Sequence, residues 1–186
     1  MKTLFIDTHY LDIIIALIEN GKVVRREEVI NKKNNSEFIF PTLIKIIDNE
    51  KIDEVVVVNG PGSFTGVRLG VTIAKTLAYT LKISLKTIDS LKVVEISSNA
   101  KKVALGDCNG YFIGLFGDNH QAIQEYYYLS NNDFENLDDK DEYTKEYKLD
   151  IEKVINYLSS QESINPHSAK PIYVKKIGVE IDKTSK

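Results

Sequence analysis

The chain has 186 residues, of which 42% are hydrophobic and 27% charged, and its formal net charge is -3. This composition is that of a globular protein, and the length allows one domain or two small lobes with a real core. The mild acidic balance argues against a protein that holds nucleic acid by charge alone, so any contact with RNA is expected to be shared with a partner.

Cys108 is the only cysteine. A single thiol can form neither an intramolecular disulfide nor a thiolate metal cage, which fits a reducing compartment. The first residues lack the apolar region of a signal peptide, and no apolar run reaches the ~18 residues that cross a bilayer. We therefore expect a soluble cytoplasmic protein with no membrane partner.

The chain opens with a predicted three-stranded meander. Thr3–Asp7 and Asp12–Ile18 are short apolar or β-branched runs, and both predict strands. Asn20-Gly21 follows, a pair that tolerates the positive φ angles of a tight hairpin, and Lys22–Val29 is the third predicted strand.

A helix, a strand, a second helix and another strand are predicted next. Apolar residues predict a helix over Phe38–Ile47 with capping side chains at Asn34–Glu37, although Pro41 implies that this helix starts late or bends. Val55–Val58 predicts a strand buried on both faces. The apolar period from Val67 to Leu81 is helical, and Ile83–Ile88 predicts a strand parallel to the previous one.

The second half repeats the opening more weakly. After a predicted helix over Ser90–Ser98, Val103–Asp107 and Tyr111–Phe116 predict strands on either side of Asn109-Gly110, and Ala122–Leu129 predicts a third. A stretch with seven carboxylates then precedes a predicted helix over residues 150–158 and a predicted final strand over residues 171–174. The carboxylate-rich stretch could meet a basic partner, but such runs are mostly just solvated.

Two lobes that each begin with an Asp-ended strand suggest a duplicated ribonuclease-H-like α/β fold, with lobes of residues 1–98 and 99–186.

The most informative segment is Asn59-Gly-Pro-Gly-Ser-Phe-Thr-Gly-Val-Arg-Leu-Gly70, between a buried strand and an amphipathic helix. Its glycines allow close approach of another surface, whereas Pro61 removes a donor and stiffens the turn. The spacing is one residue longer than a dinucleotide fingerprint and has no P-loop ending, so dinucleotide binding is only a minor alternative. Arg68 either binds a carboxylate or phosphate or fastens its own loop.

The run from Gly60 to Gly70 resembles the signature of the TsaB (YeaZ) family. Phe5–Thr8, Asn35–Glu37 with Pro41, Asp107, and Pro171–Val174 support the resemblance. The chain departs from the family pattern at Asn35, where the family usually has His, and after Asp107, where an arginine-containing run is usual. The signature residues in this chain are Gly60, Pro61, Gly62, Ser63, Phe64, Thr65, Gly66, Arg68 and Gly70.

The resemblance implies an actin-like ATPase fold with two small lobes and mixed sheets that has lost its catalytic equipment. Such a protein is an accessory subunit and not an enzyme: it partners TsaD, with TsaE joining, in forming threonylcarbamoyladenosine beside the anticodon of tRNAs that read codons beginning with A. It contacts tRNA only within that complex, and a second copy of the chain is an alternative partner. The resemblance implies no tightly bound cofactor, and any nucleotide is expected at the interface with a partner.

The motifs and the resemblance suggest residues for a nucleotide site and for a partner interface. Asp7, Thr8 and Asp107 are candidates for a nucleotide site, which would be degenerate because the bulky His9 and Tyr10 disfavour tight ATP binding. Asp7 could still bind a metal weakly, but we favour an aspartate that caps the turn at the end of its strand. The three histidines are far apart in sequence, and no metal site is expected. An active kinase or ATPase of the same fold is the alternative function. The predicted partner interface on the first-lobe helices, in which Ile73 is expected to be exposed, comprises Phe38, Leu43, Val67, Val71, Ile73, Ala74 and Leu77.

Overall fold

The first lobe is built on a five-stranded sheet. The computed structural model describes residues 1–10, 12–30 and 35–175. The strand order is β3-β2-β1-β4-β5, and β2 alone runs against the other strands, which is the ribonuclease-H-like arrangement. All five predicted strands of this lobe are confirmed. Their bounds are β1 Lys2–Asp7, β2 Ile13–Glu19, β3 Lys22–Val29, β4 Glu54–Val58 and β5 Ser84–Ile88.

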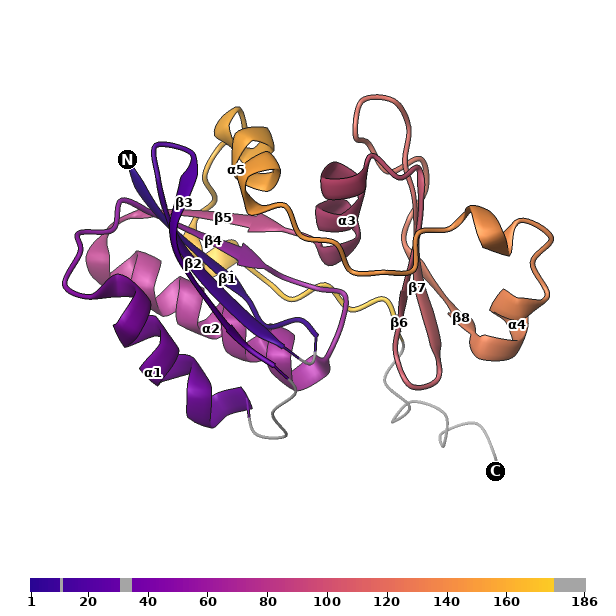
Figure 1. The fold of residues 1–186 in the computed structure, drawn as a ribbon, viewed down its shortest axis with the longest axis horizontal. Helices are drawn as coiled ribbons and strands as arrows, with labels where there is room; N and C mark the ends of the chain where they lie inside the picture. The colour runs from indigo at the N-terminus through magenta and orange to yellow at the C-terminus, as the bar shows by residue number, and fades with distance from the viewer. Residues whose placement is uncertain (11, 31–34, 176–186) are drawn as a thin grey trace.

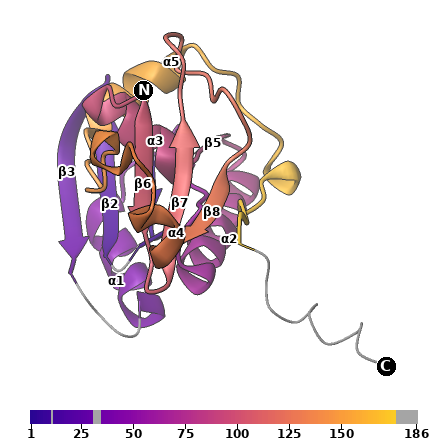
Figure 2. The ribbon, with the colours of Figure 1, turned by 90° about the vertical axis from the view of Figure 1, so that its right-hand side faces the viewer.

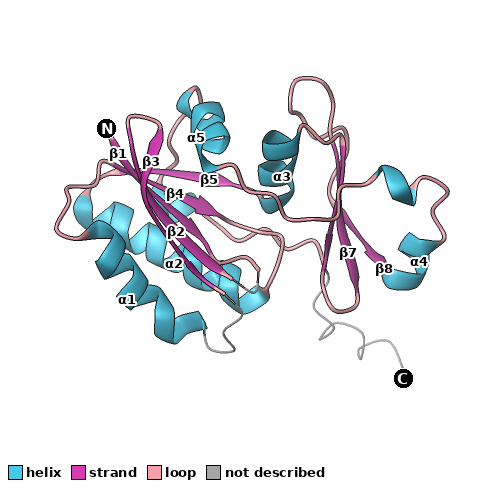
Figure 3. Ribbon diagram, viewed as in Figure 1, coloured by secondary structure: helices cyan, strands magenta, loops and turns pink. Residues whose placement is uncertain are grey.

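Helices cover both faces of this sheet (Figure 3). On one face lie α1 (Asn35–Ile47) and α2 (Phe64–Leu81), and on the other lie α3 (Ser90–Ser98) and α5 (Ile151–Ser159). Successive residues of a strand point to opposite faces, so Leu4 and Ile6 pack under α1 and α2, while Phe5 packs under α3 and α5. Both faces of β1 and β4 are therefore apolar, as the unbroken hydrophobic runs predict.

The second lobe holds a smaller sheet of β6 (Lys102–Gly106), β7 (Gly110–Leu115) and β8 (Tyr127–Ser130), which lie side by side in Figure 2. All three strands are antiparallel, and a parallel bridge between Val103 and Thr144 flanks β6. One face of the sheet packs on α3, while α4 (Asn131–Glu135) and the 3-10 turn η1 (Lys140–Glu142) lie on its other side. Mixed sheets were expected in both lobes. The strands of the first lobe pair in both parallel and antiparallel directions, whereas the three strands of the second lobe pair only in antiparallel directions.

The chain returns to the first lobe after the second sheet (Figure 1). Four apolar side chains of α5 are buried against the first sheet. The following segment, with the 3-10 turn η2 (Pro166–Ser168), runs back along α2, and Ala169 is buried in the same core as that helix. We call residues 170–175 the strap. The division into residues 1–98 and 99–186 stays a prediction, and residues 151–169 pack with the first of these units.

Three predicted elements differ from the structure. The predicted strand over residues 171–174 is wrong: the strap has no strand structure, because Pro171 lacks an N–H and only an isolated backbone bond joins Ile172 N to Asn59 O. Helix α1 begins at Asn35 with Pro41 inside it, so it does not start late, and the proposed capping residue Asn34 lies outside the described residues. The third strand of the second lobe begins at Tyr127, and Ala122 forms only an isolated bridge.

Most carboxylates of the carboxylate-rich stretch are exposed to solvent, as expected, but the stretch also has regular structure. It forms α4 and η1, and Phe134 is fully buried beneath the second sheet. Lys102 forms ion pairs with Asp139 and Glu142, both at 2.6 Å. In the part of the chain that the structure describes, no helix has the length and apolarity to cross a bilayer.

Candidate functional site

Asp7, at the end of β1, is sealed inside the first lobe. One carboxylate oxygen lies 2.6 Å from Nδ1 of His9 and also accepts the His9 backbone N–H, and the other accepts the Tyr147 hydroxyl at 2.6 Å. Burial opposes ionisation, but the electrostatic interaction with the His9 ring and these hydrogen bonds outweigh it and lower the pKa of Asp7 below its usual value. Burial beside this carboxylate raises the pKa of the Tyr147 hydroxyl well above its usual value. Both oxygens of Asp7 are thus engaged by the chain itself.

The signature glycines hold α2 against the loop that follows β1. A Cβ at Gly62 would lie 2.2 Å from the carbonyl oxygen of His9, and one at Gly66 would lie 2.0 Å from that of Thr8. At Gly70 the clash would be with Oγ1 of Thr8, at 2.4 Å. Thr8 completes the contact, since its hydroxyl donates to the Gly66 carbonyl at 2.7 Å. The glycines therefore serve a close backbone junction inside the lobe.

The turn before α2 is held by its own hydrogen bonds. Ser63 is the N-cap, accepting from the Gly66 N–H, and its own N–H donates to the His9 carbonyl at 2.6 Å. The hydroxyl of Ser90 donates to the Pro61 carbonyl at 2.6 Å, and Gly60 has φ of +94° before a cis bond to Pro61. Thr65 is exposed in the first turn of α2. The turn is a stiff corner with several of its polar groups already bonded.

The strap closes over this corner. Ile172 N donates to Asn59 O at 2.8 Å, and a Cβ on Gly60 would lie 3.0 Å from the Ile172 carbonyl oxygen. Arg68 Nε donates to the Tyr173 hydroxyl at 2.7 Å, and its guanidinium lies 3.6 Å from the centre of the Phe64 ring. Of the two roles weighed for Arg68, the structure supports the fastening role, and it fastens the strap as well as its own loop.

Asp107, at the end of β6, faces the first lobe from the second. One oxygen accepts the backbone N–H groups of Asn109 and Gly110 and the Tyr128 hydroxyl, and the other lies 3.2 Å from Nζ of Lys175 in the strap. Partial burial opposes ionisation, but the bonds from Tyr128, Asn109 and Lys175 outweigh it and lower the pKa of Asp107. Like Asp7, this carboxylate has partners on both oxygens.

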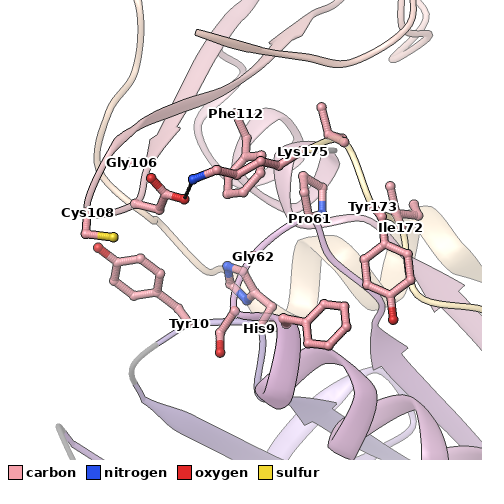
Figure 4. A pocket seen from close by; sticks show the side chains of 14 residues that line it. His9, Tyr10, Pro61, Gly62, Gly106, Cys108, Phe112, Ile172, Tyr173 and Lys175 are labelled. Atoms are coloured by element: carbon pink, nitrogen blue, oxygen red, sulfur yellow. Dashed lines mark hydrogen bonds and ion pairs between the residues drawn. The ribbon is translucent and has the colours of Figure 1, made fainter. Parts of the chain in front are cut away.

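A pocket of about 790 Å³ lies between these parts (Figure 4). Its walls come from His9 and Tyr10, the signature turn from Pro61 to Phe64, residues 106–108 with Phe112, and strap residues 172–175. It thus joins the ends of β1 and β6, where the sequence placed the degenerate nucleotide site. Asp107 lines the pocket, but Asp7 and Thr8 do not, because they are buried beneath the loop.

The predicted interface residues are mostly core. Leu43, Val67, Val71 and Ala74 are at most 4% exposed, and Phe38 and Leu77 are partly buried. The expectation that Ile73 is exposed is wrong, because it is 6% exposed and packs in the core beneath α1 and α2. The large exposed apolar side chains of α1 are instead Phe40 and Ile44, at 58% and 73%. Helical periodicity identified the apolar side of each helix but could not separate the buried stripe from its exposed margin.

No group of three or more His, Cys, Asp or Glu residues within the described ranges could hold a metal ion. Cys108 is a free, exposed thiol at the edge of the pocket. Sequence reasoning missed Tyr147, Tyr173 and Lys175. Each acts on a residue at least 68 positions away, and no local pattern marks such a contact.

The chain is similar to known proteins in sequence and in fold. The family model for TsaD, described as tRNA N6-adenosine threonylcarbamoyltransferase, matches residues 31–106. The protein TsaB of Bacillus subtilis is 36% identical over 99 residues, which cover 50% of this chain and 43% of that protein. Over about half of its length the chain is thus similar to a TsaB protein. TsaB of Buchnera aphidicola is 35% identical over 68 residues, covering 34% of this chain and 32% of the relative.

The chain thus spans less than half the length of the TsaB proteins that it matches. Solved structures extend the likeness in fold to more than nine tenths of the chain. YeaZ from Pseudomonas aeruginosa superposes with a TM-score of 0.71 at 14% identity, covering 92% of this chain and all of that one. A second structure from that organism, described as similar to peptidase YEAZ, has a TM-score of 0.72 at 15% identity and covers 94% of this chain and 99% of that one. The chain has the α/β fold of YeaZ.

Proposed function

We propose that this chain is a non-catalytic scaffold subunit that partners a TsaD-like protein, joined by a TsaE-like ATPase, in forming threonylcarbamoyladenosine in tRNA. The tRNAs are those that read codons beginning with A, and the work takes place in the cytoplasm. The observation that carries the proposal is the 36% identity to a protein named for threonylcarbamoyladenosine biosynthesis.

The state of the two strand-end carboxylates supports a scaffold role. An ATPase of this fold needs a free carboxylate and a small-residue turn beside the phosphates. Here Asp7 is 2% exposed and occupied by His9 and Tyr147, and His9 stands where a kinase has glycine. Asp107 is occupied by Tyr128 and Lys175. These contacts weigh against the alternative function, an active kinase or ATPase.

The helical face of the first lobe supports partner binding. Phe40 and Ile44 on α1 are more than half exposed and lie one turn apart on the outer side of the helix. Apolar side chains of this size on one helix face are typical of protein interfaces. We propose that this face receives the TsaD-like subunit, or a second copy of the chain, and that any nucleotide binds at that interface.

Depletion tests the cellular role. Removing the protein and measuring threonylcarbamoyladenosine in total tRNA by mass spectrometry should show its loss, and restoring the wild-type chain should return it. An unchanged level after depletion would overturn the proposal. Titration of the purified chain with magnesium and ATP separates the alternative, since tight magnesium-dependent binding would favour an enzyme.

A charge on the outer face of α1 tests the interface. Ile44→Asp should abolish co-purification with the TsaD-like subunit, because an ionised carboxylate would be buried against apolar surface. The matched control is Ile123→Asp in the second lobe, where the side chain is 66% exposed. Both variants should keep the wild-type circular dichroism spectrum and melting temperature. Equal retention of the partner by the two variants would sink the proposed interface.

A further inference from the structure

The pocket between the lobes has the size and walls of a small-molecule site. Its volume of about 790 Å³ falls within the ~300–1,000 Å³ of known ligand pockets. Aromatic and aliphatic side chains from four separate segments face it, namely Tyr10, Phe64, Phe112, Ile172 and Val174. Such walls favour a flat, mainly apolar molecule that can stack on rings.

The same pocket is poorly suited to phosphate. At the start of α2, where anions commonly bind, the Ser63 N–H is used by the His9 carbonyl and the Gly66 N–H by the Ser63 hydroxyl. Lys175, the lysine that lines the pocket, is paired with Asp107, whose negative charge would repel a phosphate. A triphosphate would therefore meet a carboxylate and find few free donors.

His9 supplies one polar group without a partner. The residue is 2% exposed, and its Nε2 has no hydrogen-bond partner among the described residues. Because Nδ1 lies 2.6 Å from the carboxylate of Asp7, the proton of a neutral ring resides on Nδ1, and Nε2 presents a lone pair. Figure 4 shows the ring at the floor of the pocket. A buried acceptor of this kind calls for a donor from a ligand or a water molecule.

We propose that the interlobe pocket binds a planar aromatic molecule without phosphate groups, and that this molecule donates a ring N–H to Nε2 of His9. The ring stacks on Tyr10 and the aliphatic strap residues, and the strap forms one wall of the site. The proposal concerns the pocket alone and does not depend on the proposed role in tRNA modification.

Indole and 1-methylindole are a matched pair of probes, since they share the ring and differ in the N–H. The full-length protein is titrated with each, and with ATP and magnesium, while the ¹⁵N signal of the His9 ring is followed by NMR. Indole should bind and shift the Nε2 signal, and 1-methylindole should bind about tenfold more weakly, the worth of one hydrogen bond. Equal affinities of the two indoles, no binding of indole, or tighter binding of ATP would overturn the proposal.

A variant locates the binding. Val174→Trp places a large ring in the pocket from the half-buried strap, and should remove indole binding by occupying its space. Ile123→Trp, at an exposed position outside the pocket, is the control and should bind indole as the wild type does. Indole binding that survives in a folded Val174→Trp protein would place the site elsewhere and overturn the proposal.

Discussion

The ends of β1 and β6 are equivalent positions in the two lobes, but the aspartates there differ in burial and in hydrogen-bond partners. Each strand ends in an aspartate that sits beside the interlobe pocket and accepts a tyrosine hydroxyl. Asp7 is 2% exposed and joins the first lobe to Tyr147, which follows the second sheet, whereas the side chain of Asp107 keeps 28% exposure and caps its own turn. The comparison teaches that one strand-end carboxylate has become a structural anchor and the other a turn cap.

The anchor depends first on the close junction beneath it, and the largest effect should come from breaking that junction. Gly66→Ala puts a methyl group 2.0 Å from the Thr8 carbonyl oxygen, and neither backbone can yield cheaply. We expect the free energy of unfolding to fall by about 3 kcal/mol, measured by urea denaturation. The control is Gly117→Ala, whose new methyl group would make only ordinary contacts, the nearest at 3.4 Å. Equal stability of the two variants would contradict the role given to the signature glycines.

Paired tyrosine substitutions compare the two strand ends directly. Tyr147→Phe removes the donor to buried Asp7 and should cost about 2 kcal/mol of unfolding free energy, as for other hydrogen bonds to a buried charge. Tyr128→Phe removes the equivalent donor to the more exposed Asp107 and should cost about 0.5 kcal/mol. Both are measured by urea denaturation at neutral pH. Equal costs, or the reverse order, would show that the two carboxylates are not used differently.

The pH dependence of stability should follow the same division. The pKa of Asp7 is lower in the folded protein, so its contribution is present above the ordinary carboxyl pKa of about 3.9 and is lost as the pH falls through the folded value. We therefore expect Asp7→Asn to be less stable than wild type at pH 6, with the difference shrinking below pH ~4. Urea midpoints at several pH values test this. A difference that stays constant down to acid pH would mean that the charge of Asp7 is unimportant.

The smallest effect is expected at the ion pair of the strap. Lys175 is an exposed residue and lies 3.2 Å from Asp107, so solvent screens the pair. Lys175→Met should lower the free energy of unfolding by less than about 1 kcal/mol. A larger loss would show that the strap holds the second lobe more firmly than the Asp107 contacts suggest.

The first lobe was well predicted because its patterns are local. Strands with apolar runs, the Asn20-Gly21 hairpin and the glycine-rich turn each carry their own signal, and the structure has all of them in the predicted order. Asp7 and Asp107 do lie at strand ends, as predicted, whereas their role in a degenerate nucleotide site stays a prediction. Parallel and antiparallel pairing then follow from the connections.

The features that were not predicted depend on contacts between residues far apart in the sequence, which no local sequence pattern reveals. The partners of Asp7 and Arg68 come from Tyr147 and Tyr173, 140 and 105 residues away. Polar composition hid α4, whose one fully buried residue, Phe134, decides its place. The exposure of Ile73 was predicted wrongly. Whether a residue at the edge of the apolar side of a helix is buried depends on the neighbouring helix, and the spacing of apolar residues along one helix does not reveal this.

The return of α5 to the first sheet has a consequence for synthesis on the ribosome. The face of the sheet that carries Phe5 and Val56 is covered in part by Val154, Ile155 and Leu158. Until those residues leave the ribosome, the apolar surface of the first lobe is exposed and can bind chaperones. Asp7 also lacks the hydrogen bond from Tyr147 at this stage. We therefore expect a fragment of residues 1–98 to bind a hydrophobic dye that the whole chain does not bind, and a fragment that binds no more dye than the whole chain would contradict this.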